Sequence, residues 1–186
     1  MKNNLVVISL GSNQNDREDF LVKAVDKLTE RNKLICLSSL YEASPTDFLE
    51  QDHFLNAIAI FLTKDSPEDF FKNCRQIEKN LGQPEVKEIE KGPRKIDLDI
   101  ILYNQECIDK KIGNNHLTLP HKSYHERLFV LKPMLECEKI LDHTFKHPLL
   151  KKSTEKLLEN GEGKKLFADQ KIKVFQQKWH PFLMTP

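Results

Sequence analysis

The segment with the most obvious chemistry in this 186-residue chain is Gly92-Pro93-Arg94-Lys95-Ile96-Asp97-Leu98-Asp99. Because side chains alternate between the two faces of a β-strand, Asp97 and Asp99 are expected to point the same way. Two carboxylates about 6 to 7 Å apart along a strand repel each other unless a positive group lies between them. Mg²⁺ suits that role, since it binds one or two carboxylates and takes its other ligands from water and substrate phosphates. The same pattern also fits two surface aspartates that pair with Arg94 and Lys95, so spacing alone leaves both interpretations open.

Phe54 and Asn56 form a second candidate group, because the same period of two puts them on one face of a predicted strand. An aromatic ring beside an amide can stack on a flat heterocycle and hydrogen-bond its edge. Phe129, which follows the Pro120-His121 segment, is a candidate for a second stacking surface. Taken alone, these residues are more simply explained as core phenylalanines and a cross-strand polar residue.

The elements that must position these residues follow from hydrophobic periodicity and turn signals. The expected order is a strand over 5–10, a helix from 15 or 16 to 28, strands over 34–42 and 54–63, a helix over 67–81 and a strand over 96–103. This order predicts an α+β fold, a ferredoxin-like βαββαβ sheet with its two helices on one face. Two long segments, 41–53 and 83–95, lead into the third and fourth strands, and long loops in a compact domain are usually functional or disordered.

The C-terminal part of the chain shows weaker patterns. Prolines interrupt the sequence after Asn104, and one further helix is expected over 148–159, followed by a Lys-rich stretch with the only tryptophan. We therefore predict one domain over residues 1–160 and a C-terminal extension over 161–186.

Composition and charge disfavour several classes of protein. Lys and Arg number 29 and Asp and Glu 28, whereas a protein that grips nucleic acid through phosphate contacts usually carries a clear basic excess. The longest apolar run, 57–62, is far too short for a membrane span. The four cysteines form no CxxC pair, as expected for separate thiols in a reducing compartment. We expect a cytoplasmic protein without a nucleic-acid or membrane partner.

Four stretches of the sequence occur in an order that is more specific than any one of them. They are Ser9-Leu10-Gly11-Ser12-Asn13, then Tyr41-Glu42 with Phe54-Leu55-Asn56, then Gly92 to Ile100, and finally Leu119-Pro120-His121 with His125 to Leu131. Together they resemble the 6-hydroxymethyl-7,8-dihydropterin pyrophosphokinase family. The resemblance implies transfer of the β,γ-pyrophosphoryl unit of ATP to the pterin hydroxymethyl group, with release of AMP, in folate biosynthesis. It also implies dihydropteroate synthase as the next enzyme and a partner.

The resemblance implies roles for individual residues as well. Asp97 and Asp99 would hold two Mg²⁺ ions on the triphosphate, and Asp97 would accept the proton of the substrate alcohol. Arg94 beside them would hold a phosphate and act as a catalytic residue. The implied pterin contacts are the rings of Phe54 and Phe129, the amide of Asn56 and the backbone around Ala43, Ser44 and Thr46. The implied ATP contacts are Arg75, Glu78, Arg94, Ile100, His121 and Arg127.

The chain departs from the family pattern near the expected ATP site. Family members commonly carry arginines after the glycine that ends the second helix, and here that stretch reads Gln83-Pro84-Glu85-Val86-Lys87. Arg75 stands where a glutamine is usual. These departures leave a catalytically weakened relative that still binds pterin or nucleotide as an alternative. A ferredoxin-like RNA-binding module is the alternative from another class, and the acidic Asp97-Asp99 pair argues against it.

Overall fold

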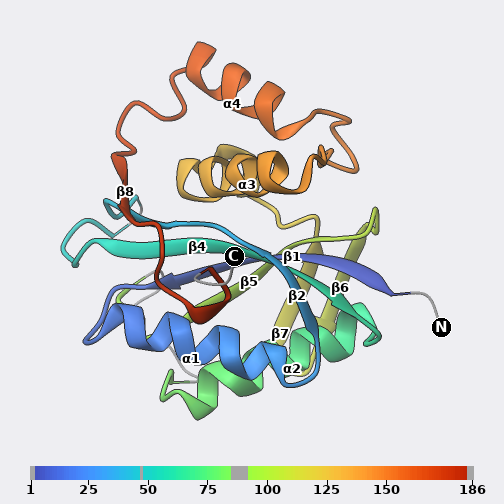
Figure 1. The fold of residues 1–186 in the computed structure, drawn as a ribbon. Helices are drawn as coiled ribbons and strands as arrows, with labels where there is room; N and C mark the ends of the chain where they lie inside the picture. The colour runs from blue at the N-terminus through green and yellow to red at the C-terminus, as the bar shows by residue number, and fades with distance from the viewer. Residues whose placement is uncertain (1–2, 47, 85–91, 184–186) are drawn as a thin grey trace.

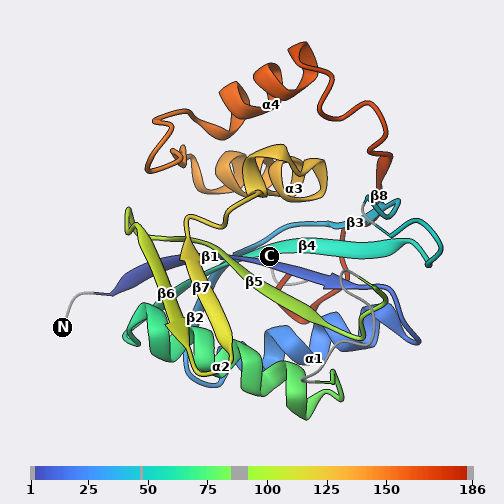
Figure 2. The ribbon, with the colours of Figure 1, turned by 180° about the vertical axis from the view of Figure 1, so that it is seen from behind.

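The computed structural model describes residues 3–46, 48–84 and 92–183 of the chain. Its centre is a six-stranded antiparallel sheet in the order β5-β1-β4-β3-β8, with β2 also paired to β4. Helices cover both faces of this sheet (Figures 1 and 2). The sheet strands are β1 (Asn4–Ser12), β2 (Lys33–Leu37), β3 (Leu40–Ala43), β4 (Phe54–Thr63), β5 (Asp97–Tyr103) and β8 (Ile172–Gln176).

One face of the sheet carries α1 (Arg17–Thr29) and α2 (Pro67–Asn80), which lie below it in Figure 1. Both helices begin where the sequence predicts. The Asp16 side chain accepts a hydrogen bond from the Asp19 N–H, and the Ser66 side chain accepts one from the Asp69 N–H. These bonds satisfy donors that have no partner inside a helix, so they fix where each helix starts.

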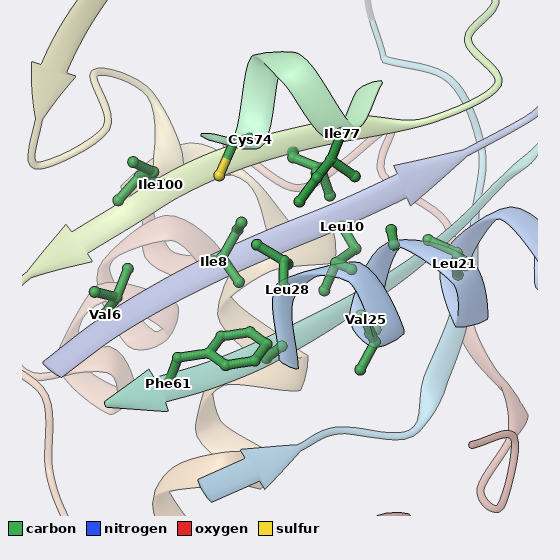
Figure 3. Close-up of a cluster of buried hydrophobic side chains, with 14 of the residues drawn as sticks. Val6, Ile8, Leu10, Leu21, Val25, Leu28, Phe61, Cys74, Ile77 and Ile100 are labelled. Atoms are coloured by element: carbon green, nitrogen blue, oxygen red, sulfur yellow. The ribbon is translucent and has the colours of Figure 1, made fainter. Parts of the chain in front are cut away.

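The larger hydrophobic core lies between these two helices and the sheet (Figure 3). Alternate residues of β1 point into it, while the residues between them face the other side of the sheet. The side chains labelled in Figure 3 are Val6, Ile8, Leu10, Leu21, Val25, Leu28, Phe61, Cys74, Ile77 and Ile100. Because β5 follows the same alternation, its aspartates are turned away from this core.

The opposite face is covered by α3 (Leu128–Leu141), on which α4 (Thr154–Gly163) packs. The two helices on one face that the sequence predicts are therefore only part of the arrangement. The sequence pattern does not indicate α3, because Pro133 lies inside the helix. The helix is also buried on both sides, so it has no clear polar stripe. Its C-terminal end is joined to α4 by Glu138, whose Oε1 accepts hydrogen bonds from Thr154 Oγ1 at 2.7 Å and Phe145 N at 2.6 Å.

Three further elements differ from the sequence prediction. The strand expected over 34–42 is interrupted at Ser38 and Ser39, so that it forms β2 and β3. A hairpin of β6 (Ile108–Ile112) and β7 (Asn115–Leu119) follows β5. The stretch after Gly161 adds β8 to the sheet edge beside β3, and the Trp179 indole donates to Ser38 O at 2.9 Å. Within the described ranges, no helix is long and apolar enough to cross a membrane.

Candidate active site

A cavity opens where the end of β1, the start of β4, the start of β5 and the first turn of α3 converge. Its volume is about 840 Å³ with its open mouth included, within the range of small-molecule sites. The cavity is lined by Ser9, Gly11, Ala43, Ser44, Pro45, Thr46, Gln51, Phe54, Asn56, Arg94, Asp97, Asp99, Ile101, His121, Arg127, Phe129 and Val130. Eleven of these are residues that the sequence analysis names as site residues: Ala43, Ser44, Thr46, Phe54, Asn56, Arg94, Asp97, Asp99, His121, Arg127 and Phe129.

The two aspartates lie on one face of β5, as the strand period predicts, and both line the cavity. In the register with β1, Asp97 lies opposite Gly11 and Asp99 lies opposite Ser9. These small neighbours leave the space above the carboxylates open. Gly11 also permits a close approach from β4, because a Cβ at this position would lie 3.3 Å from Asn56 Oδ1.

Positive groups surround both carboxylates. Arg94 Nη1 lies 2.6 Å from Asp97 Oδ1, which is a short charge-assisted hydrogen bond. Asp99 has three looser neighbours, and the distances from its oxygens are 4.0 Å to Arg75 Nη2, 3.9 Å to Arg127 Nη1 and 3.7 Å to His121 Nε2. The alternative interpretation, in which the aspartates pair with a neighbouring cation, is thus also supported for Asp97, because Arg94 pairs with it.

His121 reaches this cluster from the chain segment that follows β7. Its backbone N–H donates to Ile101 O at 3.0 Å, which holds the residue beside β5. Burial lowers the pKa of the His121 imidazole, and the Arg127 cation lowers it further, while the Asp99 carboxylate acts in the opposite direction. The lowered pKa favours the neutral ring, and because Ser123 N donates to its Nδ1 at 3.4 Å, the ring proton lies on Nε2, which can donate one hydrogen bond.

The aromatic wall of the cavity comes from two distant parts of the chain. Phe54 begins β4, and Phe129 lies in the first turn of α3. Both rings are half-buried, and the Arg127 guanidinium lies 5.7 Å from the centre of the Phe129 ring. Asn56, two residues along β4 from Phe54, is 3% exposed. The cavity thus combines flat apolar surfaces, a buried amide and a pair of carboxylates.

A second cavity lies between α2 and the turn of the β6–β7 hairpin, and it shares Asp97 with the first. It contains Arg75 and Glu78, which form an ion pair at 2.9 Å. Glu78 Oε1 also accepts a hydrogen bond from Leu98 N at 2.7 Å, and Arg75 Nη2 donates to Leu98 O. Burial raises the pKa of Glu78 to about 8, although the Arg75 guanidinium favours the carboxylate.

Two predicted features of the site, Ile100 and Gln83 of the loop after α2, lie outside the first cavity. Ile100 lines neither cavity, since its side chain is 5% exposed in the core against α2, and Ile101 lines the first cavity instead. On the loop that departs from the family pattern, Gln83 Oε1 accepts a hydrogen bond from Lys95 N at 3.0 Å. The rest of that loop, 85–91, lies outside the described residues.

Asn13 supports the site from outside both cavities, and in the sequence it stands out only as the last residue of the first motif stretch. Its side chain is 2% exposed, accepts a hydrogen bond from Arg94 N at 2.6 Å and donates to Gln51 Oε1 at 3.0 Å. It also donates to Asp52 O at 3.1 Å. Asn13 therefore joins the loop before Phe54 to the residue that contacts Asp97.

The chain resembles one known protein family over most of its length. The family model of 7,8-dihydro-6-hydroxymethylpterin-pyrophosphokinase (HPPK) matches residues 7–139. The chain belongs to the HPPK family. It is 38% identical over 141 residues to the 2-amino-4-hydroxy-6-hydroxymethyldihydropteridine pyrophosphokinase of Bacillus subtilis. The aligned region covers 74% of this chain and 81% of that protein. It is also 36% identical over 162 residues to the folic acid synthesis protein fol1 of Schizosaccharomyces pombe, covering 86% of this chain.

The resemblance seen in the sequence motifs is thereby confirmed at the level of the HPPK family. A crystal structure described as HPPK-DHPS in complex with substrates shares the fold, with a TM-score of 0.67 over 90% of this chain at 14% identity. Several relatives are much longer than this chain. It spans 21% of the fol1 protein and 45% of the solved HPPK-DHPS chain.

Proposed function

We propose that this protein transfers the β,γ-pyrophosphoryl unit of ATP to 6-hydroxymethyl-7,8-dihydropterin, with release of AMP, as a step of folate biosynthesis. The observation that carries the proposal is the first cavity, which joins two aromatic rings and a buried amide to two carboxylates on one strand. Membership of the HPPK family supports it, as does the name of the Bacillus subtilis relative. We propose the cytoplasm as its location, in keeping with the free cysteines of the described residues.

The aromatic end of the cavity would bind the pterin. Phe54 and Phe129 would stack on the two faces of the ring system, because aromatic side chains offer apolar area and favourable offset stacking. The Asn56 amide would donate to and accept from the pterin edge. The backbone around Ala43, Ser44 and Thr46 would supply further hydrogen bonds, since these residues line the same cavity.

Asp97 and Asp99 would hold two Mg²⁺ ions, which neutralise the phosphate oxygens and favour in-line attack. The donor set fits this ion. The described residues contain no group of three or more His, Cys, Asp or Glu side chains that could hold a metal. Mg²⁺ needs no such cage, because it takes one or two protein carboxylates and completes its shell with water and phosphates. Asp97 would also accept the proton of the pterin hydroxyl as the alcohol attacks.

The ATP contacts would extend from the aspartates toward the second cavity. Arg94, Arg127 and His121 surround the carboxylates on the side of the first cavity, where they would bind phosphate oxygens. Arg75 and Glu78 lie in the second cavity, which shares Asp97. The side chain of Ile100 is buried in the core, so its main chain is what would contact the nucleotide.

We also infer a ferredoxin-like unit over β1-α1-β2/β3-β4-α2-β5, since β5, β1 and β4 are adjacent and β2 and β3 pair one after the other along the second edge of β4. Residues 1–160 would form the catalytic domain, and 161–186 would form an extension that packs on it and adds β8 to its sheet. Dihydropteroate synthase is the partner that we propose as next enzyme, in keeping with solved chains that combine HPPK and DHPS. The RNA-binding alternative is disfavoured, because α3 covers the sheet face that such a module leaves open.

The test is to measure AMP formation from ATP, Mg²⁺ and 6-hydroxymethyl-7,8-dihydropterin. We expect AMP to form only when all three are present. In parallel, calorimetry with a non-hydrolysable ATP analogue, adding the pterin before and after it, separates an enzyme from the alternative of a weakened relative. Tight binding of both ligands without AMP formation would favour the weakened relative. No binding of either ligand would refute the proposal.

A further inference from the structure

The segment that follows α4 contacts both walls of the first cavity. Gln170 Oε1 accepts a hydrogen bond from Leu128 N at 2.7 Å, and Gln170 Nε2 donates to Glu126 O at 2.8 Å. At the next residue, Lys171 O accepts from Ser44 N at 3.0 Å, and Lys171 N donates to Ser44 Oγ at 3.2 Å. Two consecutive residues thus join the loop after β3 to the beginning of α3.

These contacts fix the backbone beside residues that line the cavity. Glu126 and Leu128 flank Arg127, so the Gln170 amide holds the backbone on both sides of that arginine. The helix α3 starts without a side-chain cap of its own, because Arg127 makes no capping hydrogen bond. Gln170 replaces the missing cap and satisfies a first-turn N–H that has no partner inside the helix. Phe129 lies one residue beyond Leu128, in the same turn.

The turn that presents Gln170 is itself fixed by packing. Phe167 is 8% exposed and belongs to the core beneath α3, while Gln170 N donates to Phe167 O at 3.0 Å. A Cβ at Gly161 would lie 2.2 Å from the Phe167 ring, so only glycine admits the ring at this place. On the other side, Ile172 begins β8 and lies opposite Ala43 of β3. Gln170 and Lys171 are therefore held on both sides.

We propose that Gln170 and Lys171 are positioning residues for the pterin, and that they set the spacing between the Ser44 loop and the first turn of α3. The inference rests on the proposed function of the cavity. It assigns the C-terminal segment a part in substrate binding, although its side chains do not line the cavity. The Gln170 side chain carries the bond to α3, whereas Lys171 acts through its main chain, so Gln170 is the residue to substitute.

Gln170→Met keeps the length of the side chain and removes the bonds to Leu128 and Glu126, together with a local bond from Gln170 Nε2 to Leu166 O at 3.1 Å. Without these bonds the pterin must itself order the first turn of α3 when it binds, so we expect about a tenfold rise in the KM for the pterin, equivalent to roughly 1.4 kcal/mol. The KM for ATP should rise less than the KM for the pterin, since Arg127 is only one of the proposed ATP contacts and Arg75 and Arg94 do not depend on Gln170. Gln176→Met is the matched control, because the Gln176 amide donates to Lys178 O, away from the cavity.

The readouts separate positioning from general stability. Both variants are assayed for the KM of each substrate and for kcat, and their thermal unfolding is followed in parallel. A lower unfolding temperature with an unchanged pterin KM would overturn the proposal, as would equal effects of the two substitutions. Absence of turnover and of pterin binding in the unsubstituted protein would instead refute the proposed function.

Amide hydrogen exchange of the unsubstituted chain tests the same contacts without any variant. The N–H groups of Leu128 and Ser44 should exchange slowly, because each is bonded to the C-terminal segment. In Gln170→Met the Leu128 amide should exchange faster while the amides of β1 stay protected. Rapid exchange of Leu128 and Ser44 in the unsubstituted protein would overturn the proposal even if the variant failed to fold.

Discussion

Replacing Asp99 by asparagine separates metal binding from structural charge pairing. Asp99→Asn keeps the size of the side chain and removes its charge, while the matched substitution Asp97→Asn does the same one step along the strand face. Asp109→Asn is the control, because Asp109 is an exposed aspartate of β6 that pairs with His116 outside both cavities. The proposed two-metal site predicts a large loss of activity for the first two variants and none for the third.

The structure predicts a small effect of Asp99→Asn on stability. The three contacts of Asp99 are 3.7 to 4.0 Å long, and its side chain is 30% exposed. Ion pairs of this length and exposure contribute about 1 kcal/mol or less each. Removing the negative charge of Asp99 also leaves the Arg75 and Arg127 cations without their shared anion, and their repulsion lowers stability slightly. We therefore expect a loss of about 1 kcal/mol in the free energy of unfolding.

The expected effect on activity is much larger. A bound metal ion stabilises several kcal/mol of developing charge, so losing one carboxylate ligand should lower kcat by about a thousandfold, equivalent to roughly 4 kcal/mol. Asp97→Asn should lower kcat at least as much, since Asp97 is also the proposed proton acceptor. Its stability loss should exceed that of Asp99→Asn, because its bond to Arg94 is only 2.6 Å long.

Activity is measured as AMP release at saturating Mg²⁺, and stability by urea unfolding of the same preparations. Calorimetric titration of the ATP analogue with and without Mg²⁺ shows whether the Mg²⁺-dependent part of the binding is lost. If Asp99→Asn kept more than a tenth of the activity, the metal assignment would be wrong. A stability loss above about 3 kcal/mol would show that Asp99 is a structural charge, as expected for a buried ion pair.

Three further outcomes follow from the site. Phe129→Ala should weaken pterin binding by roughly 1 to 3 kcal/mol and ATP binding much less, and Phe54→Ala should do the same while also lowering the unfolding temperature. Equal losses for both ligands in calorimetry would contradict stacking. Asn13→Ala should lower stability by roughly 2 kcal/mol and also lower kcat, because the backbone N–H of Arg94 loses its acceptor, Asn13 Oδ1; an unchanged kcat would show that Arg94 is held by other contacts. The pKa of Glu78 lies at about 8 in the folded protein against an ordinary value of 4.5. Between pH 4.5 and pH 8, the folded state therefore binds a proton at Glu78 that the unfolded state has lost. Its contribution to stability is therefore complete below about pH 4.5 and is lost as pH rises through about 8, and urea unfolding across this range should show a slope that Glu78→Gln removes.

Much of the site could be predicted from local sequence, because local geometry fixes it. The period of a strand determines that Asp97 and Asp99 share a face, whatever the rest of the chain does. The same holds for Phe54 and Asn56 on β4. The N-terminal caps of α1 and α2 are likewise encoded within three or four residues, so both helices begin where the sequence predicts.

The missed elements depend on partners that are distant in the sequence. β8 is a strand because β3 offers it a pairing edge, and three of its five residues are exposed, so it lacks a hydrophobic pattern. The β6–β7 hairpin did carry a signal, since Gly113-Asn114 is a typical turn pair and Gly113 has φ +60°. Gln170 carries none, because its partners Glu126 and Leu128 lie more than 40 residues away.

The cations around the aspartates have two uses, and this explains how the site remains stable without ligand. In the free protein, Arg94 neutralises Asp97, while Arg75 and Arg127 share Asp99. On the proposed function, the two carboxylates would hold Mg²⁺, and the same guanidinium groups would then bind phosphate oxygens. Total charge at the site then stays nearly balanced in both states. An arginine at position 75 is compatible with this exchange because the Glu78 side chain, at 2.9 Å, holds the guanidinium in place when the phosphates are absent.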